Sequence, residues 1–119
     1  KNLNKINISN KVVILEKNVF GGCENLNEIT IPYGMINIGD GAFEECKSLR
    51  EVSIPDSVAS IGDYAFWNCQ SLNQITVWSN VTSIGYSAFD GCKNLTIRAF
   101  KGSYAERYAL ENEIPFEEI

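Results

Sequence analysis

The chain has 119 residues, of which 45% are hydrophobic and 21% are charged, which is the composition of a globular domain or of part of a larger protein. Its net charge of -5 argues against a nucleic-acid partner and against a basic membrane-surface helix. There is no histidine, which excludes histidine-based triads and histidine-ligated zinc, and no apolar run is long enough to insert into a membrane.

The four cysteines recur at intervals of 23 residues, and the rest of the chain follows the same period. The main columns are Cys23, Cys46, Cys69 and Cys92; Phe20, Phe43, Phe66 and Phe89; Leu3, Leu26, Leu49, Leu72 and Leu95; and Ile6, Ile29, Val52 and Ile75. A unit of this size cannot bury its own apolar face, whereas stacked units bury a continuous one. The period therefore predicts a solenoid.

Each unit contains the same succession of short elements. Residues 49–54 have the alternation of a strand, and the proline that follows ends its hydrogen-bond ladder. Residues 58–61 form a second short extended piece in this prediction. After a glycine, residues 63–66 are expected to form one helical or 3₁₀ turn that Asp63, and Asp40 one unit earlier, would cap.

The cysteine column is expected to hold reduced, buried thiols. Equivalent residues of adjacent coils lie side by side at the strand spacing, with their side chains parallel, which is poor geometry for a disulfide. Two disulfides are the alternative that four cysteines suggest. A metal site is not expected, because stacked positions form a line and not a tetrahedron.

The periodicity stops after Leu95, where Arg98 takes an aliphatic position and Phe100 the next inward one. Ser103 and Glu106 form a capping box that predicts a helix over residues 104–111, ended by Asn112. Several side chains of this segment are expected to cover the last coil: Tyr104, Ala105, Tyr108, Ala109 and Leu110. We thus divide the chain into repeats over residues 1–100 and a cap over residues 101–119.

The first coil is partial and has no such cap, and an open edge promotes pairing with other chains. Further repeats or another domain are therefore expected upstream. A first coil that frays, or that a dimer partner shields, is the alternative.

The unit over residues 49–69 resembles the BspA-type leucine-rich repeat, also called the Treponema pallidum type, and the resemblance covers nearly the whole chain. It implies an α/β leucine-rich-repeat solenoid of 23-residue coils, with a parallel β-sheet on the concave face and a C-terminal helical cap. It also implies a surface or secreted protein of a host-associated bacterium that binds matrix proteins, plasma proteins or cells. The family offers no catalytic residues and no cofactor, so we expect a protein that is not an enzyme.

Polar residues between the apolar columns are expected to face a partner, with Trp78, which replaces the proline of earlier units, beside them. The candidate partner-binding residues are Arg50, Glu51, Asn73, Gln74 and Trp78. Further aromatic residues outside the core columns are Tyr33, Tyr64, Trp67 and Tyr86. The favoured hypothesis is a cell-surface or secreted module for adhesion or for binding protein, with glycan as a second ligand class. The alternative is a structural spacer that displays another domain and has no ligand.

Overall fold

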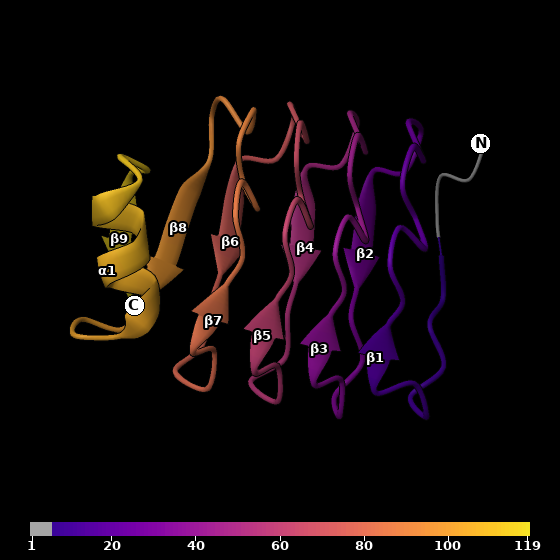
Figure 1. Cartoon of the computed structure of the whole chain (residues 1–119), viewed down its shortest axis with the longest axis horizontal. Coiled ribbons are helices and arrows are strands. Elements are labelled where there is room, and N and C mark those ends of the chain that lie inside the picture. The colour runs from indigo at the N-terminus through magenta and orange to yellow at the C-terminus, as the bar shows by residue number, and fades with distance from the viewer. Residues whose placement is uncertain (1–5) are drawn as a thin grey trace.

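The computed structural model describes residues 6–119 and has the form of a solenoid whose coils stack along its longest axis (Figure 1). The coil that carries β1 (Ile14–Leu15) lies at one end of the stack, and the single helix of the described residues lies at the other (Figure 1). Leu3, the first member of the leucine column, lies outside the described residues. The predicted solenoid is confirmed.

Two parallel ladders of short strands run along the stack. The first ladder consists of β2 (Glu28–Thr30), β4 (Glu51–Ser53), β6 (Gln74–Thr76), β8 (Thr96–Ala99) and β9 (Phe116–Glu118). The second consists of β1 (Ile14–Leu15), β3 (Asn37–Ile38), β5 (Ser60–Ile61) and β7 (Ser83–Ile84). Ile29 pairs with Val52, so residues that are 23 apart in the sequence are partners in the ladder. Both predicted extended pieces are confirmed, within narrower bounds than predicted.

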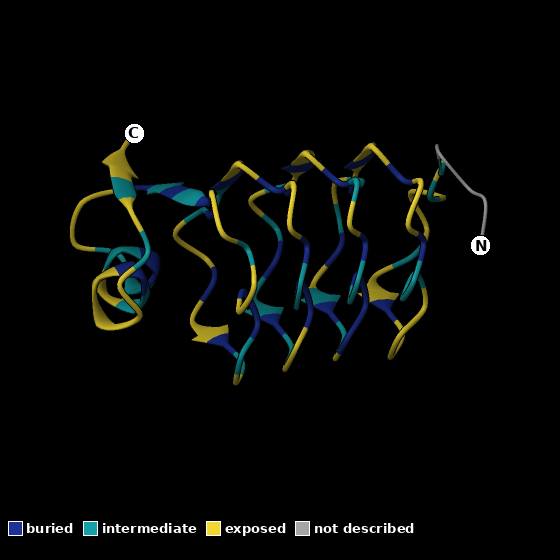
Figure 2. Ribbon diagram, turned by 90° about the horizontal axis from the view of Figure 1, so that it is seen from above, coloured by how far each residue is buried: buried dark blue, intermediate teal, exposed yellow. Residues whose placement is uncertain are grey.

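The repeated apolar columns fill the interior between the two ladders, and the exposed residues face outward (Figure 2). Every buried side chain of the described core is hydrophobic. The phenylalanines form one continuous stack, in which the ring centroids of Phe43 and Phe66 lie 5.2 Å apart and those of Phe66 and Phe89 lie 5.3 Å apart. Offset or edge-on ring contacts of this kind add to the free energy gained from burial. The stack thus joins successive coils through the core.

The segment after each strand of the second ladder is a series of β-turns, so the predicted helical or 3₁₀ turn is wrong. The backbone N–H groups alternate between two kinds of partner: Ala65 N donates to Gly62 O within the coil, whereas Phe66 N donates to Ala88 O of the next coil. The predicted aspartate caps are also wrong. Asp40 Oδ1 accepts from the backbone N of Asp63 at 2.8 Å, one coil away. Because neighbouring coils supply the partners, these turns hold the stack together.

The cysteines are free thiols, as expected, and three of them donate to a carbonyl of the preceding coil. Cys46, Cys69 and Cys92 Sγ lie 3.1–3.2 Å from the carbonyl oxygens of the phenylalanines 26 residues earlier. A hydrogen bond with Cys92, together with burial, raises the pKa of the Cys69 thiol. Because the thiolate is the reactive form, Cys69 is expected to be inert.

We predict that the denatured chain contains four thiols that react with Ellman's reagent in the absence of reductant. In the folded chain at pH 8, Cys92 should react first, because it is only partly buried while the other three are buried. Mass spectrometry of the labelled protein identifies the residue. A count below four in the denatured chain, or a faster reaction at Cys69 than at Cys92, would contradict this prediction.

The coil before the helix is one residue shorter than the others, which corrects two predictions. Ile75 pairs with Ile97, 22 residues on, so Ile97 and Ala99 point inward and are fully buried. Arg98 therefore points away from the core, and its Nε lies 2.8 Å from Glu117 Oε1 on β9. Phe100, predicted to fill an inward position, is 43% exposed.

The helix α1 (Tyr104–Glu111) has the predicted bounds, and the Ser103 side chain accepts from the Glu106 backbone N. Ala105 and Ala109 are buried, but Leu110 is 65% exposed, so the prediction that Leu110 covers the last coil is wrong. Tyr108 packs against the end of the phenylalanine stack, and burial raises the pKa of Tyr108 to about 12. Strand β9 pairs with β8 and extends the first ladder.

Candidate functional site

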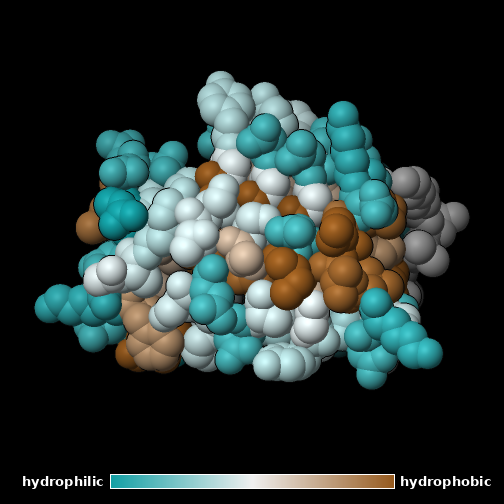
Figure 3. Space-filling view, turned by 60° about the horizontal axis from the view of Figure 1, so that its bottom comes forward, coloured by the Kyte–Doolittle hydropathy of each residue, from teal (hydrophilic) through white to brown (hydrophobic). Residues whose placement is uncertain are grey.

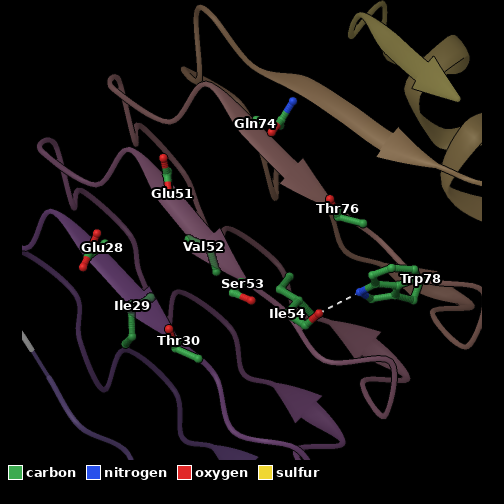
Figure 4. A pocket seen from close by; sticks show the side chains of 10 residues that line it. All are labelled: Glu28, Ile29, Thr30, Glu51, Val52, Ser53, Ile54, Gln74, Thr76 and Trp78. Carbon is green, nitrogen blue, oxygen red and sulfur yellow. Dashed lines mark hydrogen bonds between the residues drawn. The ribbon is translucent and has the colours of Figure 1, made fainter. Parts of the chain in front are cut away.

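A groove runs across the outer surface of the first ladder (Figure 4). We call it the strand groove and define it by its lining residues: Glu28, Ile29, Thr30, Glu51, Val52, Ser53, Ile54, Gln74, Thr76 and Trp78. Its volume is about 380 Å³. A second hollow of about 260 Å³ shares Glu28, Ile29 and Thr30 with it and continues to Ile6 and Pro32. Together the two hollows follow the direction of stacking, which suits an elongated ligand.

Two rows of polar side chains line the strand groove, because each strand places alternate residues on its outer face. One row holds Glu28, Glu51 and Gln74, which are direct partners in the ladder. The other holds the hydroxyl groups of Thr30, Ser53 and Thr76, at the opposite ends of the same strands (Figure 4).

The strand groove carries negative charge that is not paired within the described part of the chain. Glu28 and Glu51 are exposed neighbours in register, and like charges at such positions repel each other. The ion pairs of residues 6–119 lie elsewhere, at Lys47 with Glu45 and at Arg98 with Glu117. A cationic group between the two carboxylates would relieve this repulsion.

Trp78 forms the wall at the C-terminal side of the strand groove. Its indole Nε1 donates to Ile54 O at 2.8 Å, which folds the ring back toward the preceding coil (Figure 4). The ring centroid lies 6.0 Å from that of Phe100, the residue that the shortened coil turns outward. Because the indole N–H is already bonded, Trp78 offers a ligand its aromatic surface and not a hydrogen bond.

Three of the five predicted partner-binding residues come together in the strand groove, namely Glu51, Gln74 and Trp78. Arg50 and Asn73 are exposed immediately before β4 and β6, but they are not among the lining residues. Four further polar residues line it, namely Glu28, Thr30, Ser53 and Thr76; they belong to the polar columns expected on this face but are not among the five candidates. Glu28 shares the column of Glu51 and Gln74, whereas Thr30, Ser53 and Thr76 form a second polar column two residues on; this periodicity is the signal in the sequence that identifies them.

A different surface of the solenoid is apolar. Hydrophobic side chains gather toward the N-terminal end of the face that carries the second ladder (Figure 3). The large exposed aliphatic residues of the first two coils are Val13, Ile14, Val19 and Ile36. Further along the stack the residues equivalent to Val13 and Ile36 are Ala59 and Thr82, so the apolar character fades toward the helix.

In residues 6–119, no three or more cysteine, aspartate or glutamate side chains cluster in a way that would hold a metal ion. The acids of the strand groove stand on an open sheet surface, in register, with hydroxyl and amide groups beside them. These side chains offer hydrogen bonds and negative charge along the direction in which the coils stack.

The match to a family model shows which known proteins this chain is related to. The model of the BspA type leucine rich repeat region matches residues 1–114 in 6 copies. The chain belongs to this family. The match extends past residue 100, into the segment predicted as a cap.

Solved structures of leucine-rich proteins from three bacteria are similar to this chain. A leucine-rich repeat protein from Bacteroides ovatus is 35% identical and aligns over 90% of this chain with a TM-score of 0.79. A leucine rich cell surface protein from Faecalibacterium prausnitzii is 41% identical over 71% of the chain, with a TM-score of 0.68. The leucine rich repeat protein of T. pallidum is 26% identical over 73% of the chain, with a TM-score of 0.57.

This BspA-type chain spans only part of those relatives: 28% of the B. ovatus chain, 22% of the F. prausnitzii chain and 52% of the T. pallidum chain. No curated protein matches it. Within residues 6–119, no helix combines the length and the apolar character needed to cross a bilayer.

Proposed function

We propose that this chain is a non-catalytic adhesion module of a cell-surface or secreted protein, and that it binds an extended segment of a protein partner in the strand groove. The observation that carries this proposal is the continuity of the groove across successive strands, with hydrogen-bonding side chains repeated at each coil. An extended peptide places alternate side chains on one face, so it can meet such a row coil by coil.

The chemistry of the groove favours a partner segment that carries lysine or arginine. Glu28 and Glu51 offer two adjacent carboxylates, and the hydroxyls of Thr30 and Ser53 offer hydrogen bonds beside them. Complementary charge accelerates encounter and selects against acidic partners. The name of the F. prausnitzii relative, a leucine rich cell surface protein, supports the proposed location.

We predict that beads coated with this chain adhere to surfaces coated with a matrix or plasma protein, and that Glu51→Lys lowers the number of retained beads at least about fivefold, because it places a cation in the groove. Soluble oligolysine should compete for the wild-type chain, while oligoglutamate of equal length should not. Bead counting under constant flow measures the effect.

Glu111→Lys is the matched control, since it makes the same change of charge at an exposed position on α1, outside the groove. Adhesion of this variant should equal that of the wild type. Equal losses in both variants would assign the effect to net charge and contradict a site in the groove. Failure of the wild-type chain to bind either protein or oligolysine would favour the spacer alternative, in which this chain displays another domain and has no ligand of its own.

A further inference from the structure

Three aromatic side chains that depart from the repeat gather on the turns after β5 and β7. The ring centroids of Tyr64 and Trp67 lie 6.4 Å apart with the planes at 81°, and those of Tyr64 and Tyr86 lie 5.8 Å apart at 79°. Tyr64 and Trp67 belong to one turn segment, and Tyr86 belongs to the next coil. The perpendicular rings form an exposed aromatic corner, whose residues are not among those that line the strand groove.

Core packing does not explain these residues. In the other coils the position of Trp67 is held by Gly21, Glu44 and Asp90, and the position of Tyr64 by Asn18, Gly41 and Ser87. Tyr86 is 72% exposed and Tyr64 is 40% exposed.

The backbone at Tyr64 also departs from what the residue prefers. Tyr64 has a φ of 59°, in the left-handed region that bulky residues rarely adopt. The equivalent turn forms with glycine at Gly41, so the fold does not require a tyrosine here. Strained residues of this kind concentrate at sites of function.

A carboxylate completes the corner. Glu44, from the preceding coil, lines a hollow of about 160 Å³ together with Tyr64 and Trp67. Glu44 takes part in none of the ion pairs of residues 6–119, whereas its neighbour Glu45 lies 3.8 Å from Lys47. Aromatic walls and one unpaired negative charge attract a cation, because the face of an aromatic ring carries negative potential.

We propose that the hollow formed by Glu44, Tyr64 and Trp67 binds a quaternary ammonium group of the choline type. A trimethylammonium group spreads its charge over methyl groups that pack against rings, and it has no N–H donors that would need further acceptors. A lysine ammonium is more strongly hydrated and would need more acceptors than the single carboxylate of this hollow provides. The size of the hollow matches such a compact head group.

Titration with choline chloride at constant ionic strength tests this site. In ¹H–¹⁵N spectra, the indole signal of Trp67 should shift saturably with a Kd of about 1–10 mM, while that of Trp78 stays in place. The chain has only two tryptophans, so Trp78→Phe assigns both signals. The neutral analogue 3,3-dimethylbutan-1-ol has the same shape and should bind at least about fivefold more weakly.

Variants separate the two parts of the site. Glu44→Gln should raise the Kd for choline about three- to tenfold, because it removes the charge and keeps the shape. Tyr64→Gly should abolish saturable binding without unfolding the chain, since glycine accepts the positive φ. Tyr33→Gly is the control: Tyr33 is 76% exposed in the loop after β2, so choline binding should be unchanged.

Phosphocholine distinguishes the charge of the ligand from its shape. It should bind more weakly than choline, because its phosphate brings negative charge close to Glu44. Three results would each overturn the proposal: no saturable shift of Trp67 with choline, equal affinity for the neutral analogue, or phosphocholine binding as tight as choline. None of them would affect the strand groove, whose residues are different.

Discussion

We expect Phe66→Ala to lower the free energy of unfolding by about 3–5 kcal/mol. Phe66 is completely buried and stacks on Phe43 and on Phe89, with nearly parallel rings at 5.2 and 5.3 Å. Truncation removes the ring and leaves a cavity that joins two coils, which the stacked backbone cannot close. Since domains are stable by only about 5–15 kcal/mol, this loss is a large part of the total. Urea unfolding followed by circular dichroism measures it.

Phe100→Ala is the matched control for this prediction. It makes the same change of side chain at a position that is 43% exposed and contacts Trp78, so it should cost about 1 kcal/mol or less. If Phe66→Ala is too unstable to purify, Phe66→Leu should remain folded with a loss of about 1–2 kcal/mol. Equal losses for Phe66→Ala and Phe100→Ala would contradict a continuous aromatic stack.

The strands and the core could be predicted because one number, the period, fixes both. When residues 23 apart stack, Ile29 must pair with Val52, and the apolar columns of the sequence become lines of side chains that are buried in the middle coils. The helix could be predicted because Ser103 and Glu106 carry a local signal that needs no tertiary information.

The turns and the last coil could not be predicted correctly, because their structure depends on contacts between coils that the sequence does not show. An aspartate before a turn has the same appearance whether it bonds within its own coil or, as Asp40 does, to the next one. The missing residue near Ile97 leaves the leucine column intact and shifts only the residues after that column. That shift decides whether Arg98 or Ile97 is buried, and it brings Phe100 beside Trp78.

The residues that line the strand groove could be predicted from the polar columns within the strands, but not at the positions where the strands begin. Alternation along a strand identifies Glu51 and Gln74 as outward-facing, and it does the same for Glu28, Thr30 and Ser53. Arg50 and Asn73 stand next to these positions in sequence but before the strands begin, where the alternation no longer holds. The aromatic corner could not be predicted from the columns, because it depends on the bend of the turns. That bend brings Tyr64 and Trp67 next to Tyr86.

The turns that come after the second ladder lead to the last prediction, that Gly62→Ala lowers the free energy of unfolding by about 3 kcal/mol. Gly62 N donates to Ile38 O at 2.8 Å, which holds this point of the chain against the preceding coil. A Cβ at Gly62 would lie 2.6 Å from the backbone N of Asp40 and would also meet its side-chain oxygen. Because the obstructing atoms include backbone, the two coils must separate to admit the methyl group.

Gly22→Ala separates this overlap from the conformational preference of glycine. Gly22 has a φ of 75° and no atom within 4 Å of the added Cβ, so alanine there meets only the strain of the left-handed region, about 1–2 kcal/mol. Thermal and urea unfolding of both variants should therefore rank Gly62→Ala as the more damaging, although Gly62 has the more ordinary backbone. The reverse order would mean that neighbouring coils separate easily, and the hydrogen bonds that cross between the turns would then contribute little to the stability of the stack.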